Sequence, residues 1–119
     1  TAVMTDQQVG GLLEVLAPAD AVIVSVFAGR IADTGIDPVP SMARYAAWIE
    51  PFLGTELLWA SPRETLNIIQ AGECGCDIIT VTPDLLKKLQ LIGKDLGQYS
   101  RETVKMFFED GLSAGLDIA

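Results

Sequence analysis

Arg30 and Ser61 have the residue types and surroundings that suit the binding of an anion. Arg30 stands just beyond a β-branched run, where a guanidinium can hold two oxygens of a phosphate group. Ser61 ends a second apolar run and is followed by Pro62 and Glu64, which is the pattern of a helix cap. The N-terminus of such a helix offers free N–H groups to a phosphate. The two positions therefore predict an anion site.

Each of these residues also has a purely structural interpretation. Arg30 can pair with Asp33 on a solvated loop, and Ser61 can serve only as a helix cap, worth about 1 kcal/mol of stability. Arg63 can add a positive charge next to Ser61, or helical geometry can direct its side chain elsewhere. The residue types alone leave these alternatives open.

Few other residues have side chains that could take part in binding or chemistry. Ser25 and Phe27 alternate along one expected strand and so share a face, where Phe27 either lines a pocket or packs in the core. Cys74 and Cys76 have C-x-C spacing, which is poor geometry for a disulfide at the start of a strand. We expect them to be small buried side chains. The chain has no histidine, so a zinc site would need an unusual ligand set, and a Ser-His-Asp or Cys-His pair is impossible within it.

Length and charge limit the class of protein. The chain has 119 residues, which fits one domain, and its 16 acidic and 8 basic residues give a net charge of -8. This acidity disfavours binding to nucleic acid and to anionic membranes. No apolar run approaches the roughly 20 residues of a membrane span, and no signal-peptide pattern occurs. We therefore expect a reduced, cytoplasmic protein.

Short apolar and β-branched runs alternate with helix start signals along the chain. Strands are predicted over residues 19–27, 56–60 and 76–81, and the remnant of another over residues 1–4. Helices are predicted to begin near Thr5, Ser61, Thr82 and Ser100, and a further helix over residues 41–53 should follow an irregular stretch, 28–40. The side chains expected to face the core from these helices are Val9, Leu12, Leu13, Leu16, Leu85, Leu86, Leu89, Val104, Phe107 and Phe108.

Repeated strand–helix units predict an α/β fold with a parallel sheet. The sheet can be open and doubly wound or part of a barrel. Neither a G-x-G-x-x-G nor a G-x-x-x-x-G-K-[ST] motif occurs. A complete barrel takes about 250 residues, roughly twice the length of this chain.

Three stretches resemble the transaldolase family, which includes fructose-6-phosphate aldolases. They are residues 25–33 (SVFAGRIAD), 58–61 (LWAS) and 71–89 (AGECGCDIITVTPDLLKKL), and they occur in the family's order. The chain departs from the family pattern at Val26, where a proline is usual, and at Pro62. The resemblance implies that residues 1–119 form a single unit, the C-terminal half of a TIM (β/α)8 barrel with strands five to eight.

The resemblance also implies roles for individual residues. Arg30 and Ser61 would hold the phosphate of a sugar phosphate, with Arg63 as a further positive charge. Ser25 would lie near the substrate carbonyl, and Phe27 would line the pocket. Members of the family transfer dihydroxyacetone or cleave sugar phosphates through a lysine Schiff base, without a metal or an organic cofactor.

The Schiff-base lysine is not expected among the residues of this chain. On the family pattern Thr1 falls in the fifth strand, and none of Lys87, Lys88, Lys94 and Lys105 matches the catalytic position. We therefore expect no catalytic residue here and no activity from this chain alone. A half-barrel leaves sheet edges open, which predicts a homo-oligomer or association with the other half. The alternatives are a non-catalytic fragment that binds sugar phosphate or inorganic phosphate or serves in assembly, and an unrelated α/β binding module.

Overall fold

The computed structural model describes residues 1–115 and separates into two compact units, Thr1–Leu89 and the residues from Gln90 onward. The elements, in chain order, are α1 (Asp6–Val15), β1 (Val22–Val26), α2 (Ala28–Asp33), α3 (Pro38–Ile49), β2 (Thr55–Trp59), α4 (Thr65–Glu73), β3 (Ile78–Ile79), α5 (Pro83–Lys87), the 3-10 helix η1 (Lys88–Leu91) and α6 (Leu96–Ser113). The fold of the first unit is α/β, as the alternation of strand and helix signals predicts.

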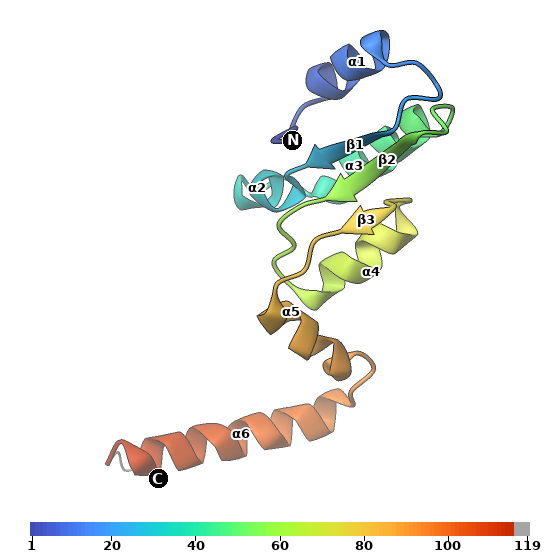
Figure 1. Ribbon diagram of the computed structural model, residues 1–119. Helices are drawn as coiled ribbons and strands as arrows, with labels where there is room; N and C mark the ends of the chain where they lie inside the picture. The colour runs from blue at the N-terminus through green and yellow to red at the C-terminus, as the bar shows by residue number, and fades with distance from the viewer. Residues whose placement is uncertain (116–119) are drawn as a thin grey trace. The chain divides into compact units, whose positions relative to one another are not determined.

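The sheet is parallel and its strands follow one another in chain order, β1-β2-β3. Figure 1 shows the three arrows side by side and pointing the same way. The predicted remnant over residues 1–4 is reduced to one parallel bridge between Val3 and Val26. The run predicted over residues 76–81 forms a strand only at Ile78–Ile79. A parallel sheet in sequential order is consistent with part of a TIM-type barrel.

One face of the sheet carries the core of the first unit. Its strand residues Val24, Val26, Leu57 and Trp59 are all at most 2% exposed. The helices α1 and α3 supply the packing partners Val9, Met42, Tyr45 and Ile49. Each such side chain contributes about 1.5–3 kcal/mol when fully buried.

The opposite face of the sheet is open within the described residues. Ile23 is 53% exposed, and Ser25, Leu58 and Ile78 are half-buried. The register places Ser25 beside Leu58, and Leu58 beside Ile78, in one row across the strands. The sequence predicts cover on both faces, because both are apolar, but the elements of the first unit cover only one.

Helix α1 begins where its capping box predicts and is fastened to α3. The Thr5 side chain accepts a hydrogen bond from the N–H of Gln8 at 3.2 Å. The Asp6 carboxylate accepts from the Tyr45 hydroxyl at 2.7 Å and from Arg44 Nη2 at 2.9 Å. The hydrogen bond from Arg44, followed by that from Tyr45, lowers the pKa of Asp6. Burial, together with the bond to Asp6, raises the pKa of Tyr45 to about 12.

The prediction of an irregular stretch over residues 28–40 is wrong, because these residues contain α2 and the start of α3. Helix α3 begins at Pro38 and ends at Ile49, instead of covering residues 41–53. Asp37 caps it, since its carboxylate accepts from the N–H of Val39 at 3.0 Å. A proline directly after an acidic cap fits the first turn of a helix.

Helix α4 begins at Thr65 rather than after Ser61. The side-chain oxygen of Asn67 accepts from the backbone N–H groups of Arg63 at 2.8 Å and Glu64 at 3.0 Å. Glu64 is therefore the cap residue, and the predicted serine cap is wrong. By contrast, Thr82 caps α5 as expected, because its hydroxyl accepts from the N–H of Leu85 at 3.3 Å.

The predictions for the later helices are only partly right. Leu85 is buried, but Leu86 is 58% exposed. Helix α6 begins at Leu96 rather than near Ser100, since the Asp95 carboxylate caps it through the N–H of Gln98 at 2.8 Å. Their own unit leaves the three residues expected to point inward from it exposed, at 64%, 62% and 45% for Val104, Phe107 and Phe108. Over residues 1–115, no helix has the length and apolarity needed to cross a membrane.

Candidate functional site

The ends of β1 and β2 approach each other so closely that only glycine fits at position 29. The Gly29 N–H donates to the carbonyl oxygen of Ala60 at 3.2 Å. A Cβ atom built on Gly29 would lie 1.9 Å from the carbonyl oxygen of Ser61, far inside any permitted contact. The first turn of α2, which carries Arg30, is thereby held against the residues that follow β2.

Ser61 has a backbone conformation that is unusual for a residue with a side chain. Its φ of 61° lies in the left-handed region, which costs of order 1–3 kcal/mol and is found most often at functional sites. Its N–H donates to Thr80 Oγ1 at 3.4 Å, which ties the end of β2 to the end of β3. Ser61 therefore stands near the carboxyl ends of the three strands, which lie side by side in the sheet.

Arg63 and Asp33 form an ion pair between the loop after β2 and helix α2. Arg63 Nη2 lies 2.7 Å from Asp33 Oδ2, and about half of each side chain is exposed. A pair this exposed adds little stability, but it holds the loop against α2. The structural alternative in which Asp33 pairs with Arg30 is wrong, because the carboxylate of Asp33 binds Arg63.

Arg30 lies in helix α2 rather than on a loop, and its side chain is exposed. Within residues 1–115, no carboxylate forms an ion pair with its guanidinium. An unpaired guanidinium next to a glycine that contacts Ser61 can accept an anion as its partner. Three of the sequence-predicted site residues, Arg30, Ser61 and Arg63, are thus brought to one end of the sheet.

A cleft of about 250 Å³ opens beside Ser61 at the carboxyl ends of β2 and β3. It is lined by Ser61, Pro62, Arg63, Thr80, Val81 and Thr82. The sequence patterns do not predict Thr80 as a site residue, and they predict only a helix cap at Thr82. The signal that both share is a hydroxyl side chain just after an apolar strand, at the edge where parallel sheets bind ligands.

Ser25 and Phe27 share the open face of the sheet and do not line this cleft. Both are half-buried, while their neighbours Val24 and Val26 point into the core. Phe27 immediately precedes α2, and its N–H donates to the carbonyl oxygen of Val3 at 2.9 Å. Phe27 is not among the buried core residues of the first unit.

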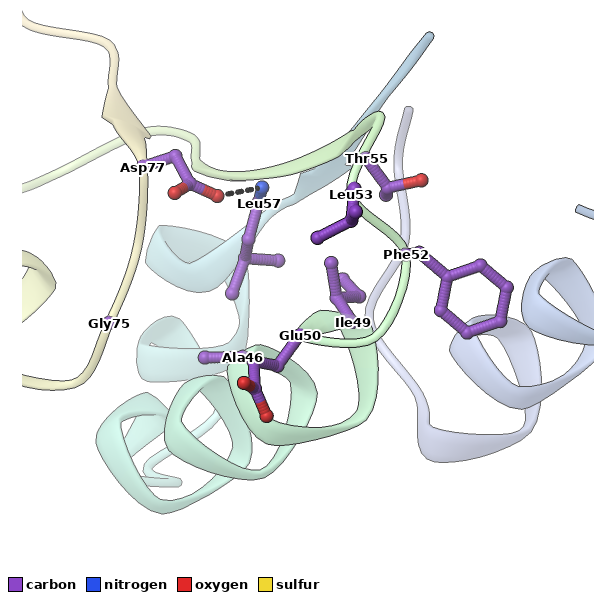
Figure 2. A pocket seen from close by; sticks show the side chains of 9 residues that line it. All are labelled: Ala46, Ile49, Glu50, Phe52, Leu53, Thr55, Leu57, Gly75 and Asp77. Carbon is purple, nitrogen blue, oxygen red and sulfur yellow. Dashed lines mark hydrogen bonds between the residues drawn. The ribbon is translucent and has the colours of Figure 1, made fainter. Parts of the chain in front are cut away.

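A second cleft, of about 240 Å³, lies at the opposite ends of the strands (Figure 2). Its lining consists of Ala46, Ile49, Glu50, Phe52, Leu53, Thr55, Leu57, Gly75 and Asp77. Figure 2 shows the Asp77 carboxylate turned toward the N–H of Leu57, which donates to it at 2.8 Å. This carboxylate fixes β3 against β2. Because ligands of parallel α/β sheets bind at the carboxyl ends of the strands, we assign the second cleft a structural role.

Comparison with known proteins gives a match over nearly the whole chain. The family model described as Transaldolase/Fructose-6-phosphate aldolase matches residues 1–118. Proteins named "Probable transaldolase" from Sphingopyxis alaskensis and Chelativorans sp. are 35% and 39% identical to this chain over 74 residues. A protein of the same name from Nitrosopumilus maritimus is 33% identical over 75 residues.

The aligned segments cover 61% of this chain and 34% of each of these three relatives. The matched part of the chain therefore spans about a third of the length of these curated proteins. The resemblance seen in the motifs of residues 25–33, 58–61 and 71–89 is confirmed at the level of the family.

Gly29→Ala tests whether the close approach at Gly29 holds the site together. The added methyl group has to displace the backbone at Ser61, so we expect a large loss of stability in thermal unfolding. Gly11→Ala is the matched control, because a Cβ at Gly11 meets nothing within 4 Å. In that helical position alanine should raise the stability by about 0.5–1 kcal/mol. Equal stability of the Gly29 variant and the native chain would contradict the packing described.

Proposed function

This chain belongs to the transaldolase/fructose-6-phosphate aldolase family, and on that premise we propose that it forms the phosphate-binding side of an aldol-type active site. The observation that carries the proposal is the close approach of Gly29, the residue before Arg30, to Ser61 at the carboxyl ends of β1 and β2. The ligand class is a sugar phosphate, with inorganic phosphate as its simplest member. Whether the parent enzyme transfers dihydroxyacetone or cleaves fructose 6-phosphate is left open.

The proposed site holds the phosphate by charge and by short polar contacts. The Arg30 guanidinium supplies two parallel N–H donors to the phosphate oxygens. The Ser61 hydroxyl supplies a further donor, and Thr80 and Thr82 add hydroxyl groups to the cleft beside Ser61, which Arg30 does not itself line. Arg63, already paired with Asp33, contributes positive potential. Such a hold on the non-reacting end of a substrate fixes the position of its carbonyl carbon.

The Schiff-base amine, in this proposal, comes from a part of the protein outside this sequence. The chemistry needs a lysine that forms a carbinolamine and then an iminium, which accepts electrons from the breaking bond. Lys87 ends α5, Lys88 lies in η1, and Lys105 lies in α6. Lys94 is held by Glu102, with 2.6 Å between nitrogen and oxygen. None of these four stands at the carboxyl end of a strand, so this chain supplies binding groups and no catalytic residue.

A second candidate function is a non-catalytic fragment that binds phosphate or serves in assembly. The open face of the sheet favours an assembly role, because Ile23 is 53% exposed there. Exposed apolar surface beyond a few hundred Å² is rarely left uncovered in a soluble monomer. We infer that this face is covered by another copy of the chain or by the other half of a barrel. Helix α6, with Phe107 62% exposed, is a further surface for such contacts.

We also propose a cytoplasmic location, since both cysteines are free thiols.

The phosphate site is tested by titrating the protein with inorganic phosphate and with fructose 6-phosphate. We expect weak binding, and Arg30→Ala should weaken it by about 1.5–3 kcal/mol, the value of a charge-assisted hydrogen bond. Arg101→Ala removes an equal charge from α6 and is the control, which should leave the affinity nearly unchanged. Equal losses in the two variants would indicate a nonspecific charge effect and reject the site.

Borohydride trapping tests the assignment of catalysis to a segment outside this sequence. A Schiff base between a lysine and fructose 6-phosphate becomes a stable secondary amine on reduction. We expect no mass adduct on the 119-residue chain, because its lysines lie in helices or are paired. A stoichiometric adduct on one lysine would show that the chain carries its own nucleophile.

Sedimentation of the isolated chain tests the cover of the open face. We expect a dimer, a larger oligomer or binding of a hydrophobic dye, since open sheet edges and one apolar sheet face are available. Ile23→Lys places a charge on the open face, and we expect it to weaken self-association. A cooperative monomer that binds no dye would refute the inference.

A further inference from the structure

Cys74 and Cys76 lie closer together than their positions in the sequence suggest. Their Sγ atoms are 3.8 Å apart, and both are free, half-buried thiols. Residues two apart in an extended strand are separated by roughly 6.6 Å along the chain. The sequence-based expectation of poor disulfide geometry rests on such a strand, and the chain is not extended here.

The reason is the turn that ends α4. Gly75 has a φ of 95°, in the left-handed region. The Cys76 N–H donates to the carbonyl oxygen of Ala71 at 2.9 Å, and the Gly75 N–H donates to that of Gly72 at 3.4 Å. These two bonds form a Schellman motif, which reverses the chain direction at a helix end. The reversal brings the cap residue Cys74 and the first residue after the glycine to the same side.

We propose that Cys74 and Cys76 form an oxidisable dithiol, which hydrogen peroxide converts reversibly into a disulfide within the turn. The sulfur atoms must approach from 3.8 Å to the bond length of about 2.05 Å. Small adjustments of the two side-chain torsions within this turn supply that movement. No role of this kind follows from the phosphate site, which lies at the other ends of the strands.

The reaction has two balanced steps. The thiolate of Cys74 attacks one peroxide oxygen and, with one proton, gives a sulfenic acid and water. The Cys76 sulfur then attacks the Cys74 sulfur, and the hydroxyl group leaves as water with the Cys76 proton. In total, two thiols and one hydrogen peroxide give one disulfide and two waters. Burial, with the neighbouring Cys74 second, raises the pKa of Cys76 well above its ordinary value.

Oxidation at this turn would act on the attachment of β3 to β2. Asp77 follows Cys76 directly and binds Leu57 twice. Its N–H donates to the Leu57 carbonyl oxygen at 3.0 Å, and its carboxylate accepts from the Leu57 N–H at 2.8 Å. A disulfide that draws Cys76 toward α4 would move the residue directly before Asp77, which forms the two hydrogen bonds with Leu57. Hydrogen exchange at the amides of Leu57 and Asp77 should therefore differ between the two redox forms.

The test is peroxide treatment of the folded chain, followed by alkylation and intact mass measurement. The chain has only two cysteines, so each mass change can be assigned. We expect the loss of two hydrogens, complete protection from alkylation, and reversal by dithiothreitol. In urea the same treatment should proceed several-fold more slowly, because the turn no longer holds the thiols together. In Cys76→Ser, a sulfenic acid on Cys74 should be trapped by dimedone.

Gly75→Ala is the geometric control. A Cβ there would lie 3.2 Å from that of Ala46 and would be strained at a φ of 95°, so the turn should open and the oxidation should slow. Circular dichroism establishes whether this variant folds, and the comparison with urea stands independently if it does not. The proposal is overturned by equal rates in native buffer and urea, by disulfides between chains, or by sulfinic acid without a disulfide.

Discussion

The contact between Gly29 and Ser61 is the constraint on which the site depends. A side chain at position 29 would place its Cβ 1.9 Å from the Ser61 carbonyl oxygen, so the ends of β1 and β2 can meet only over a glycine. The hydrogen bond from Gly29 to Ala60 fixes the first turn of α2 at this point. Arg30 and Asp33 both lie on α2. Asp33 binds Arg63 of the loop after β2, and Arg30 has no carboxylate partner among the described residues.

The same contact explains why the helix cap predicted at Ser61 is wrong. An N-cap residue usually has an extended backbone, whereas Ser61 has a φ of 61°. The sequence contains two overlapping capping patterns, Ser61 to Glu64 and Glu64 to Asn67. The approach of Gly29 is accompanied by the left-handed backbone at Ser61, so the second pattern forms the cap. Sequence reasoning ranks the serine first because it considers local preference and not the neighbouring strand.

The parts of the fold that could be predicted are those determined locally. The run from Val22 to Val26 reads as a strand from its β-branched residues, and Thr5 and Thr82 cap helices as their patterns indicate. The pairing of Asp33 with Arg63 joins residues 30 positions apart, so no local pattern contains it. The inward face predicted at Phe107 is a related case: an apolar helical stripe indicates that a face should be covered, and the residues of its own unit leave Phe107 exposed.

The candidate site residues therefore differ in how much of the protein is needed to position and enclose them. Arg30 and Ser61 belong to segments held together by backbone contacts within the first unit, so the phosphate hold that we propose needs no residue outside that unit. Ser25 and Phe27 lie on the open face, where the row from Ser25 through Leu58 to Ile78 has no opposing layer among the described residues. Only a covering layer would turn that face into an enclosed pocket. Under our proposal, the partner that shields Ile23 from water is also the one that encloses the substrate carbonyl. Assembly and catalysis would then depend on the same surface, while phosphate recognition would not.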